Sequence, residues 1–231
     1  MASILITGAN RGLGLEFVRQ CIPQGWRVFA ACRDPKGAAE LQELAAGSRG
    51  PVSVHGLDVS DFGQIEDLAR ELRGEAIDVL LNNAGIYGPK QAAFGKSDYR
   101  AWAEVLAVNV LAPMKMAECF IEQVARSERK VIICMSSLMG SVGRDNEGGH
   151  YPYRSSKAAL NMVVKNLSID LRGRGVTAVV LHPGWVKTDM GGPNAPLSTE
   201  ESIRGMLRVV HRLTMKDSGK FLSHDGSEIP W

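Results

Sequence analysis

Cysteine is scarce in this sequence, and the residues that could bind a metal stand alone. The 4 cysteines (Cys21, Cys32, Cys119 and Cys134) are far apart, lie in apolar segments and form no CxxC pair. Such spacing excludes a disulfide framework and predicts buried, reduced thiols in a cytoplasmic protein. The 5 histidines are also isolated from other candidate ligands, so we expect no metal site.

Long hydrophobic runs and an excess of one charge are missing as well. No apolar stretch reaches the roughly 18 residues that a membrane span needs, and the N-terminal segment has neither the basic region nor the cleavage site of a signal peptide. The formal net charge is +2, and no cluster of lysine and arginine suggests a groove for a phosphate backbone. We therefore expect neither a membrane span nor nucleic acid as a partner.

What the sequence does contain is a regular alternation of short apolar runs with longer helical patterns. The runs cover Ser3–Thr7, Arg27–Cys32, Val52–His55, Ile77–Asn82, Lys130–Met135, Val176–Leu181 and Lys220–Ser223. Most lack a period of two, which is typical of parallel strands buried on both faces. Between them apolar residues recur at helical spacing, as at Leu13, Phe17 and Cys21. The pattern predicts one α/β domain over residues 1–231. We expect a Rossmann-type, doubly wound and mostly parallel sheet of about seven strands flanked by helices.

One longer irregular stretch, at about residues 184–198, carries several glycines and prolines. It is too short for a domain and suits a flap over a site. Trp185 and Met190 lie on this flap, and large apolar side chains there would form a wall for an apolar substrate. The alternative is that Trp185 packs into the body of the domain.

A glycine-rich turn follows the first expected strand. Thr7 to Gly14 reads TGANRGLG and runs into the first expected helix. Gly8, Gly12 and Gly14 permit a tight turn and a close approach of the backbone to a pyrophosphate, while the helix N-terminus supplies free N–H groups. Its place in the first strand–helix unit favours dinucleotide binding over a purely structural turn.

The end of the second expected strand indicates which dinucleotide. An NAD site needs an acid at this position to bind the ribose 2′-hydroxyl, but here Cys32 is followed by Arg33. Asp34 precedes Pro35, so we expect it to be the N-cap of the next helix. Arg33 is then free to pair with a 2′-phosphate, and Arg11 can approach from the glycine turn. These residues favour NADP(H); an ordinary surface role is the alternative for Arg33.

A tyrosine and a lysine lie at the head of a later expected helix. Tyr153 and Lys157 stand at positions i and i+4, which share one helix face. Tyr151 falls on another face relative to Lys157, and Pro152 occupies a helix-start position between the tyrosines. We therefore assign Tyr153 as the reactive tyrosine.

Several motifs occur in the order seen in the short-chain dehydrogenase/reductase family. They are TGxxxGxG from Thr7, NNAG at Asn82–Gly85, Ser136–Ser137, the pair Tyr153 and Lys157, and the PG segment His182–Thr188. The chain therefore resembles this family from Thr7 to Thr188. Closest is the carbonyl reductase branch with the sniffer and C-factor proteins, which the segment Leu181–Gly192 and the ending Asp225–Trp231 resemble.

The resemblance implies a catalytic set and a cofactor site. The catalytic residues would be Asn109, Ser137, Tyr153 and Lys157. The cofactor contacts would be Gly8, Asn10, Arg11, Gly12, Leu13, Gly14, Arg33, Asp58, Val59, Asn83, Ala84, Gly85, Tyr153, Lys157, Pro183, Gly184, Val186 and Thr188. For Asp58 and Val59, which the family assigns to adenine, a helix cap is the alternative because Ser60 and Asp61 precede the next helix.

The function that the resemblance implies is NADPH-dependent reduction of a ketone or aldehyde by hydride transfer. Tyr153 would give the proton while Ser137 holds the carbonyl oxygen. A nearby ammonium lowers the pKa of an acid by about 1–3 units, so we expect Lys157 to lower the pKa of Tyr153. With NADPH bound, Tyr153 is expected to stay mostly protonated. The family also implies a water held by Asn109.

Two other functions stay open at this point. One is an NADP-binding regulatory or signalling protein of the C-factor type with incidental turnover, which the intact Ser137, Tyr153 and Lys157 oppose. The other is an NAD-linked alcohol dehydrogenase, which Cys32 and Arg33 oppose. The expected partner is a small-molecule carbonyl or alcohol substrate. Helices on either side of the fifth strand pair into dimers in family members, which leaves a homodimer open.

Overall fold

Seven parallel strands form the centre of the fold, in the order β3-β2-β1-β4-β5-β6-β7. A computed structural model describes residues 1–48, 51–90, 93–145 and 147–231. The strands are β1 (Ser3–Thr7), β2 (Arg27–Cys32), β3 (Val52–Gly56), β4 (Val79–Asn82), β5 (Val131–Met135), β6 (Thr177–His182) and β7 (Phe221–Ser223). The predicted doubly wound α/β sheet is confirmed, and every neighbouring pair of strands is parallel.

Helices connect the strands. They are α1 (Gly12–Cys21), α2 (Ala39–Gly47), α3 (Phe62–Glu71), α4 (Tyr99–Leu106), α5 (Ala112–Ala125), α6 (Tyr151–Asp170) and α7 (Thr199–Arg212). A π-helical turn, Ala107–Leu111, joins α4 to α5. None of the helices in the described ranges is long and apolar enough to cross a membrane.

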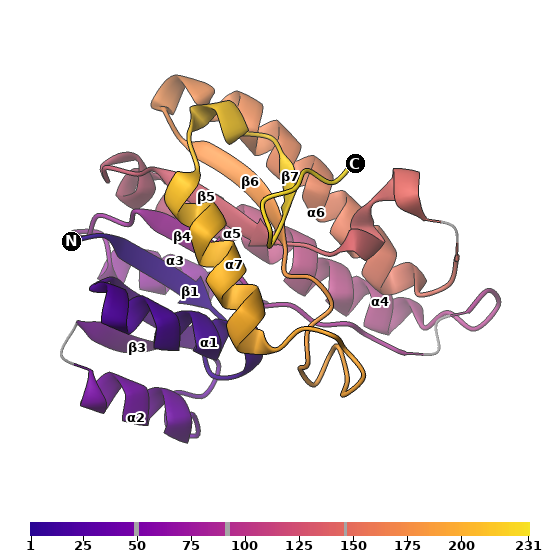
Figure 1. Cartoon of the computed structure of the whole chain (residues 1–231), viewed down its shortest axis with the longest axis horizontal. Helices are drawn as coiled ribbons and strands as arrows, with labels where there is room; N and C mark the ends of the chain where they lie inside the picture. Colours follow the sequence, from indigo (N-terminus) through magenta and orange to yellow (C-terminus); the bar gives the residue numbers. More distant parts are fainter. Residues whose placement is uncertain (49–50, 91–92, 146) are drawn as a thin grey trace.

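The helices form a layer on each face of the sheet (Figure 1). Helices α1, α2 and α7 cover one face, and α3, α5 and α6 cover the other, with α4 beside α6. Strand side chains alternate between the layers, so Ile4 and Ile6 pack with Phe17 of α1, whereas Leu5 packs with Phe120 of α5. Each large apolar side chain buried in this way contributes about 1.5–3 kcal/mol. Burial on both faces explains the nearly continuous apolar runs of the sequence.

The carboxyl ends of the strands meet at one edge of the sheet. Strand β1 has β2 on one side and β4 on the other, so successive crossovers leave β1 in opposite directions. A doubly wound sheet binds ligands in the crevice at such a switch point. The glycine turn and the NNAG motif follow β1 and β4, and both therefore lie at this point.

The segment after β2 differs from the expectation. Asp34 is not the N-cap of α2, because that helix begins at Ala39. The Asp34 carboxylate instead accepts the Gly37 N–H at 3.0 Å and closes a turn. A side-chain acceptor close to its own backbone competes with helix formation in this way, so Pro35 starts a turn and not the helix.

Helix α3 is capped as the sequence suggested, though not by Asp58. The Asp61 carboxylate accepts the N–H groups of Gly63 at 3.0 Å and Gln64 at 3.3 Å. Asp58 accepts from the Ser60 N–H and hydroxyl at 2.9 Å and 2.7 Å, so it closes the turn before the helix.

The cysteine thiols are free in the structure. Cys21, Cys32 and Cys134 are buried as predicted, while Cys119 is half-buried.

Candidate functional site

The turn between β1 and α1 has the backbone geometry of a phosphate-binding turn. Gly8 and Gly12 adopt φ values of +66° and +53°, which other residues disfavour. A β-carbon at Gly14 would lie 2.2 Å from the Gly8 carbonyl oxygen, so only glycine fits there. Arg11 is the N-cap of α1, but its side chain caps none of the first N–H groups. Those groups and the positive end of the helix dipole fit a pyrophosphate.

The NNAG motif holds this turn in place. Thr7 Oγ1 accepts the N–H groups of Asn83 and Ala84, both at 3.0 Å. The Asn83 side-chain amide donates to the carbonyl oxygens of Thr7 at 2.9 Å and Gly8 at 3.3 Å. The ends of β1 and β4 are therefore fixed to each other at the switch point of the sheet. Thr7 was part of the motif in the sequence, yet only the structure reveals its anchoring contacts.

Arg33 and Asp58 come together at the ends of β2 and β3. Hydrogen bonds from Ser60 lower the pKa of Asp58, and the exposed guanidinium of Arg33 adds to this effect. Val59 lines a narrow crevice together with Thr7 and Ala84. No ion pair joins Arg33 to another residue in the described ranges, so its guanidinium can bind an external anion.

Tyr153 and Lys157 share one face at the start of α6. They are 7% and 5% exposed, and Lys157 Nζ lies 5.6 Å from the centroid of the Tyr153 ring. The Lys157 ammonium donates to the Met135 carbonyl oxygen at 2.8 Å. Ser137, two residues after β5, lies beside Tyr153, and its side chain lowers the pKa of the tyrosine. Three of the four expected catalytic residues therefore meet at the carboxyl end of β5.

Tyr151 lies on another side of the helix. Its ring stacks on Trp102 at a centroid distance of 6.3 Å. Trp102 is fixed in turn by a hydrogen bond from Nε1 to Ser155 Oγ at 2.9 Å. The structure thus brings Tyr153, and not Tyr151, to Lys157.

The ionisation of the tyrosine differs from the expectation. Burial raises the pKa of Tyr153 to about 12, and the hydrogen bond with Ser137 offsets part of that rise. The expected lowering by Lys157 is absent because the ammonium faces the Met135 carbonyl oxygen, and burial lowers the pKa of Lys157 itself to about 8. Tyr153 therefore keeps its proton at neutral pH, which is the form that a proton donor needs.

Asn109 lies behind this group, on the π-helical turn between α4 and α5. It is 1% exposed. Its Oδ1 accepts the Ile86 N–H at 2.9 Å, and its Nδ2 donates to the Ile86 carbonyl oxygen at 2.8 Å and to Ser156 Oγ at 3.0 Å. The side chain ties the segment after NNAG to α6. Local π-helix is frequent at functional sites; the water relay expected from the family stays a prediction.

Two residues at the site were missed in the sequence. Tyr87 stacks on Tyr153 with a centroid distance of 4.4 Å and an interplanar angle of 21°. Its hydroxyl lies 3.2 Å from His150 Nδ1 and donates to Met139 Sδ at 3.8 Å. No motif marks Tyr87 or His150, because their contacts join a loop after β4 to the start of α6. An aromatic residue two positions after the NNAG segment was a signal that the sequence offered.

The flap, residues 184–198, is held at both ends. At its start, the Pro183 carbonyl oxygen accepts from Ser202 Oγ at 2.6 Å. Val186 is buried and pairs with Leu197 across the base of the flap. Gly184 adopts φ +84°, and a β-carbon there would lie 2.5 Å from Leu197 Cδ1. The expected contact residues Pro183, Gly184 and Val186 therefore form the fixed base of the flap.

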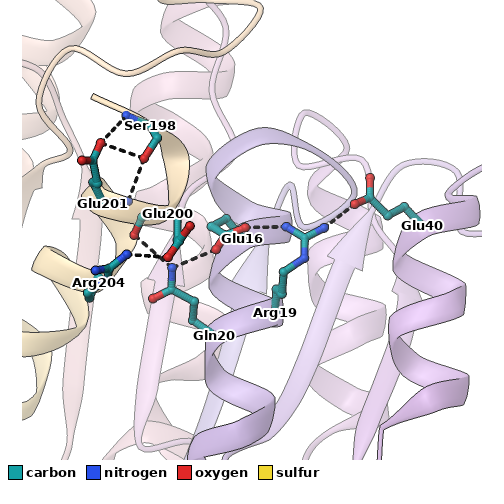
Figure 2. Close-up of polar contacts among 8 residues, drawn as sticks. All are labelled: Glu16, Arg19, Gln20, Glu40, Ser198, Glu200, Glu201 and Arg204. Atoms are coloured by element: carbon teal, nitrogen blue, oxygen red, sulfur yellow. Dashed lines mark hydrogen bonds and ion pairs between the residues drawn. The ribbon is translucent and has the colours of Figure 1, made fainter. Parts of the chain in front are cut away.

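The end of the flap is anchored to α7 and α1 (Figure 2). Ser198 forms a capping box with Glu201 at the start of α7. Gln20 of α1 donates to the Glu200 carbonyl oxygen at 3.0 Å and to the Glu16 carboxylate at 2.8 Å. The helix that carries the glycine turn is thus connected to the helix that ends the flap.

Several side chains of the flap are exposed, and the flap approaches the glycine turn. Trp185 is 57% exposed and donates from Nε1 to the Gly191 carbonyl oxygen at 2.8 Å, so it does not pack into the body of the domain. Thr188 Cγ2 lies 3.8 Å from where a β-carbon at Gly12 would stand. Arg11 pairs with Asp189 at 3.0 Å, so its guanidinium is directed to the flap.

Two further expected contacts differ in their burial. Leu13 is partly buried and packs against the core beneath α1. Asn10 is exposed. No group of three or more His, Cys, Asp and Glu in the described ranges is arranged to hold a metal ion.

Comparison with known proteins identifies relatives of similar sequence and structure. The chain is 44% identical over 155 residues to C-signal of Myxococcus xanthus, a match that covers 67% of this chain and 93% of that protein. The carbonyl reductase Sniffer of Drosophila melanogaster superposes with a TM-score of 0.95 at 36% identity, covering 100% of both chains. The NADPH-bound carbonyl reductase from chicken fatty liver gives a TM-score of 0.93 at 37% identity and covers 100% of this chain and 99% of that one.

The match to a family profile agrees with the geometry of the site. The profile described as short chain dehydrogenase covers residues 2–196, from β1 to the end of the flap. That range includes the glycine turn, the NNAG motif, Ser137 and the pair of Tyr153 with Lys157. The chain belongs to the short-chain dehydrogenase/reductase family and is similar to its carbonyl reductases.

Proposed function

We propose that the protein is an NADPH-dependent reductase of ketones or aldehydes, with Tyr153 as the proton donor. The observation that carries the proposal is the buried Tyr153 beside Ser137 and Lys157 at the carboxyl edge of the sheet, where burial also raises the pKa of the tyrosine. A general acid must keep its proton until the transition state, and a pKa near 12 ensures this across neutral pH.

Each residue has a separate task in this proposal. NADPH supplies the hydride to the carbonyl carbon. Tyr153 donates a proton to the carbonyl oxygen, and the Ser137 hydroxyl holds that oxygen by a hydrogen bond as negative charge develops. Lys157 holds the cofactor's ribose and keeps a positive charge beside the tyrosine ring. Asn109 and Tyr87 fix the loops around Tyr153.

The choice of NADP(H) rests on the ends of β2 and β3. The glycine turn fits the pyrophosphate, and β2 ends in Cys32, followed by Arg33, so no acid that would bind a ribose 2′-hydroxyl stands at its last position. A planar guanidinium suits the 2′-phosphate. The similar carbonyl reductase from chicken fatty liver carries NADPH, which supports the same cofactor here.

The test is an assay of ketones and aldehydes with NADPH and, separately, NADH. We expect loss of NADPH absorbance with at least one carbonyl compound and a higher kcat/KM for NADPH than for NADH. Turnover with NADH alone would contradict the choice of cofactor. Absence of turnover with either cofactor across a broad panel would contradict the reductase function.

A second candidate function is a regulatory protein that binds NADP(H). The observation behind it is the 44% identity to the protein named C-signal. A binding protein has no need of Tyr153 as an acid. If Tyr153→Phe abolishes turnover but leaves the effect of the protein in its cell unchanged, the regulatory function is supported. If the variant loses both turnover and that effect, the reductase function is supported.

We also propose a cytoplasmic homodimer. Free cysteines fit a reducing compartment. Met162 and Ile169, one face of α6, are 62% and 56% exposed, and Leu111 beside α5 is 53% exposed. Light scattering during gel filtration tests the assembly: a monomer in the wild type would contradict the dimer.

A further inference from the structure

A hollow with two lysines lies beside the flap and carries a charge that the described residues do not balance. It has a volume of about 480 Å³ and is lined by Lys90, Lys187, Thr188, Asp189, Gly192 and Pro193. Lys90 comes from the loop after β4, and the other residues belong to the flap. We call this space the lysine hollow.

The nearby carboxylates are already bound to other groups. Asp189 pairs with Arg11 at 3.0 Å. Lys187 lowers the pKa of Glu201, but hydrogen bonds from Ser198 are the largest cause of that shift, and they engage the carboxylate in the capping box of α7. Neither Lys90 nor Lys187 forms an ion pair within the described parts of the chain. The hollow therefore presents two ammonium groups to an external ligand.

The lysine hollow borders the cofactor turn, and one of its loops continues from a residue that contacts the proton donor. Thr188 belongs to its lining and also lies next to Gly12 of the cofactor turn. Lys90 follows Tyr87 on the same loop, and the Tyr87 ring stacks on Tyr153 at 4.4 Å. The hollow therefore adjoins the cofactor turn through Thr188, and the loop that supplies Lys90 also supplies Tyr87.

We propose that the lysine hollow is a subsite for an anionic group of the substrate, so that the preferred substrates are carbonyl compounds that also carry a carboxylate. This inference rests on the proposed reductase function. The exposed Trp185 and Met190 on the same flap would then contact the apolar part of the substrate, while the ammonium groups bind its charged end. Charge-assisted hydrogen bonds to a carboxylate provide this preference.

The cofactor's own phosphates are the competing ligand. The pyrophosphate already has the uncapped N-terminus of α1, and the 2′-phosphate has Arg33 at the tip of β2. Lys90 lies instead on the loop that passes Tyr153. These positions favour the substrate as the ligand of the two lysines.

The test compares para-formylbenzoate with its methyl ester, two aldehydes that differ in the carboxylate. The variants are Lys90→Gln, Lys187→Gln and the double variant, with Lys216→Gln as a matched control because Lys216 is exposed near the opposite edge of the sheet. At low ionic strength the wild type should have a higher kcat/KM for the acid. The ratio of acid to ester should fall at least about threefold in the double variant, as for exposed ion pairs. It should stay unchanged in Lys216→Gln, and salt should remove the wild-type preference.

Two results would overturn the subsite. One is an unchanged ratio of acid to ester in the double variant. The other is an equal loss of kcat/KM for both aldehydes together with a raised KM for NADPH, which would assign the lysines to the cofactor.

If neither aldehyde is reduced, the reductase function fails for this pair of substrates, and a binding experiment tests the subsite separately. Benzoate, but not benzamide, should then quench tryptophan fluorescence in the wild type, since Trp185 is close to Lys187 in the flap, and the double variant should lose this quenching. Equal responses to benzoate and benzamide would reject the subsite.

Discussion

The cofactor turn and the flap lie next to each other, but different features determine their structure. The backbone determines the turn, and side chains determine the surface of the flap. In the turn, backbone geometry decides everything: Gly8 and Gly12 have left-handed φ values, and Gly14 leaves no room for a β-carbon. In the flap, exposed side chains such as Trp185 and Asp189 determine what a ligand meets. A rigid turn suits an invariable ligand such as a pyrophosphate, whereas exposed side chains can vary with the substrate.

Tyr153 is buried at the start of α6, so like the cofactor turn it is held in a fixed position. Its substitution should have the largest effect on activity. Removing the hydroxyl in Tyr153→Phe removes the proton donor, so kcat should fall by about 10²–10⁴-fold. The Kd of NADPH, measured by fluorescence titration, should stay nearly unchanged because the aromatic ring remains. Tyr151→Phe is the matched control and should keep most activity, since Tyr151 stacks on Trp102. The reverse result for the two variants would reject the assignment.

The pH dependence of kcat/KM tests whether the buried Lys157 ammonium is required for reduction. Burial lowers the pKa of Lys157 from 10.5 to about 8, while Tyr153 is raised to about 12. The ammonium is therefore present below pH 8 and lost above it, although Tyr153 keeps its proton. If the charge is required, kcat/KM for reduction should fall about tenfold per pH unit above about 8, as for a single ionisation.

Two controls separate this ionisation from other causes. Lys157→Arg keeps a positive charge, so any activity it retains should lose the alkaline fall. The unfolded chain binds more protons than the folded one between the folded and unfolded lysine pKa values. The contribution of Lys157 to the free energy of unfolding should therefore rise with pH from about 8, whereas the thiols of Cys21 and Cys134, whose pKa values burial raises from 9.0 to about 12, oppose it above pH 9. Activity that stays constant to pH 10 would contradict the role of the ammonium.

The same division explains what the sequence could predict. Glycines at fixed spacing, NNAG and the Tyr153/Lys157 pair are local patterns; the structure has the first two at the expected strand ends and the pair at the expected start of a helix. The pKa of Tyr153 was predicted in the wrong direction, because sequence spacing places Lys157 nearby but does not show that its ammonium turns to Met135. Tyr87 and His150 were missed because their contacts join distant segments through side chains.

Arg33 tests the comparison at the outer end of the cofactor site, where an exposed side chain does the recognition. Arg33→Asp should raise the Kd of NADPH at least about tenfold, because it removes a charge-assisted hydrogen bond and adds a repulsive charge. The Kd of NADH, which has no 2′-phosphate, should change little. Arg33→Lys keeps the charge without the planar fork and should lie between the wild type and the aspartate variant. An equal loss for both cofactors would mean that Arg33 does not contact the 2′-phosphate.

Trp185 should give the smallest effect, and it tests whether the flap recognises substrate at all. The side chain is 57% exposed and its main contact is the hydrogen bond to Gly191, so Trp185→Ala should change the free energy of unfolding by no more than about 1 kcal/mol. If the ring forms a wall for apolar substrates, the KM for bulky ketones should rise a few-fold while the KM for small aldehydes stays constant. Trp185→Phe separates the two contributions, because it keeps a ring but loses the N–H donor. A KM pattern like that of the wild type in this variant assigns the effect to the ring, whereas a pattern like that of Trp185→Ala assigns it to the conformation of the flap. An equal rise in KM for bulky and small substrates in Trp185→Ala would reject the hypothesis that Trp185 forms a wall for apolar substrates. The cofactor turn would then be the part of this pair of segments that selects a ligand.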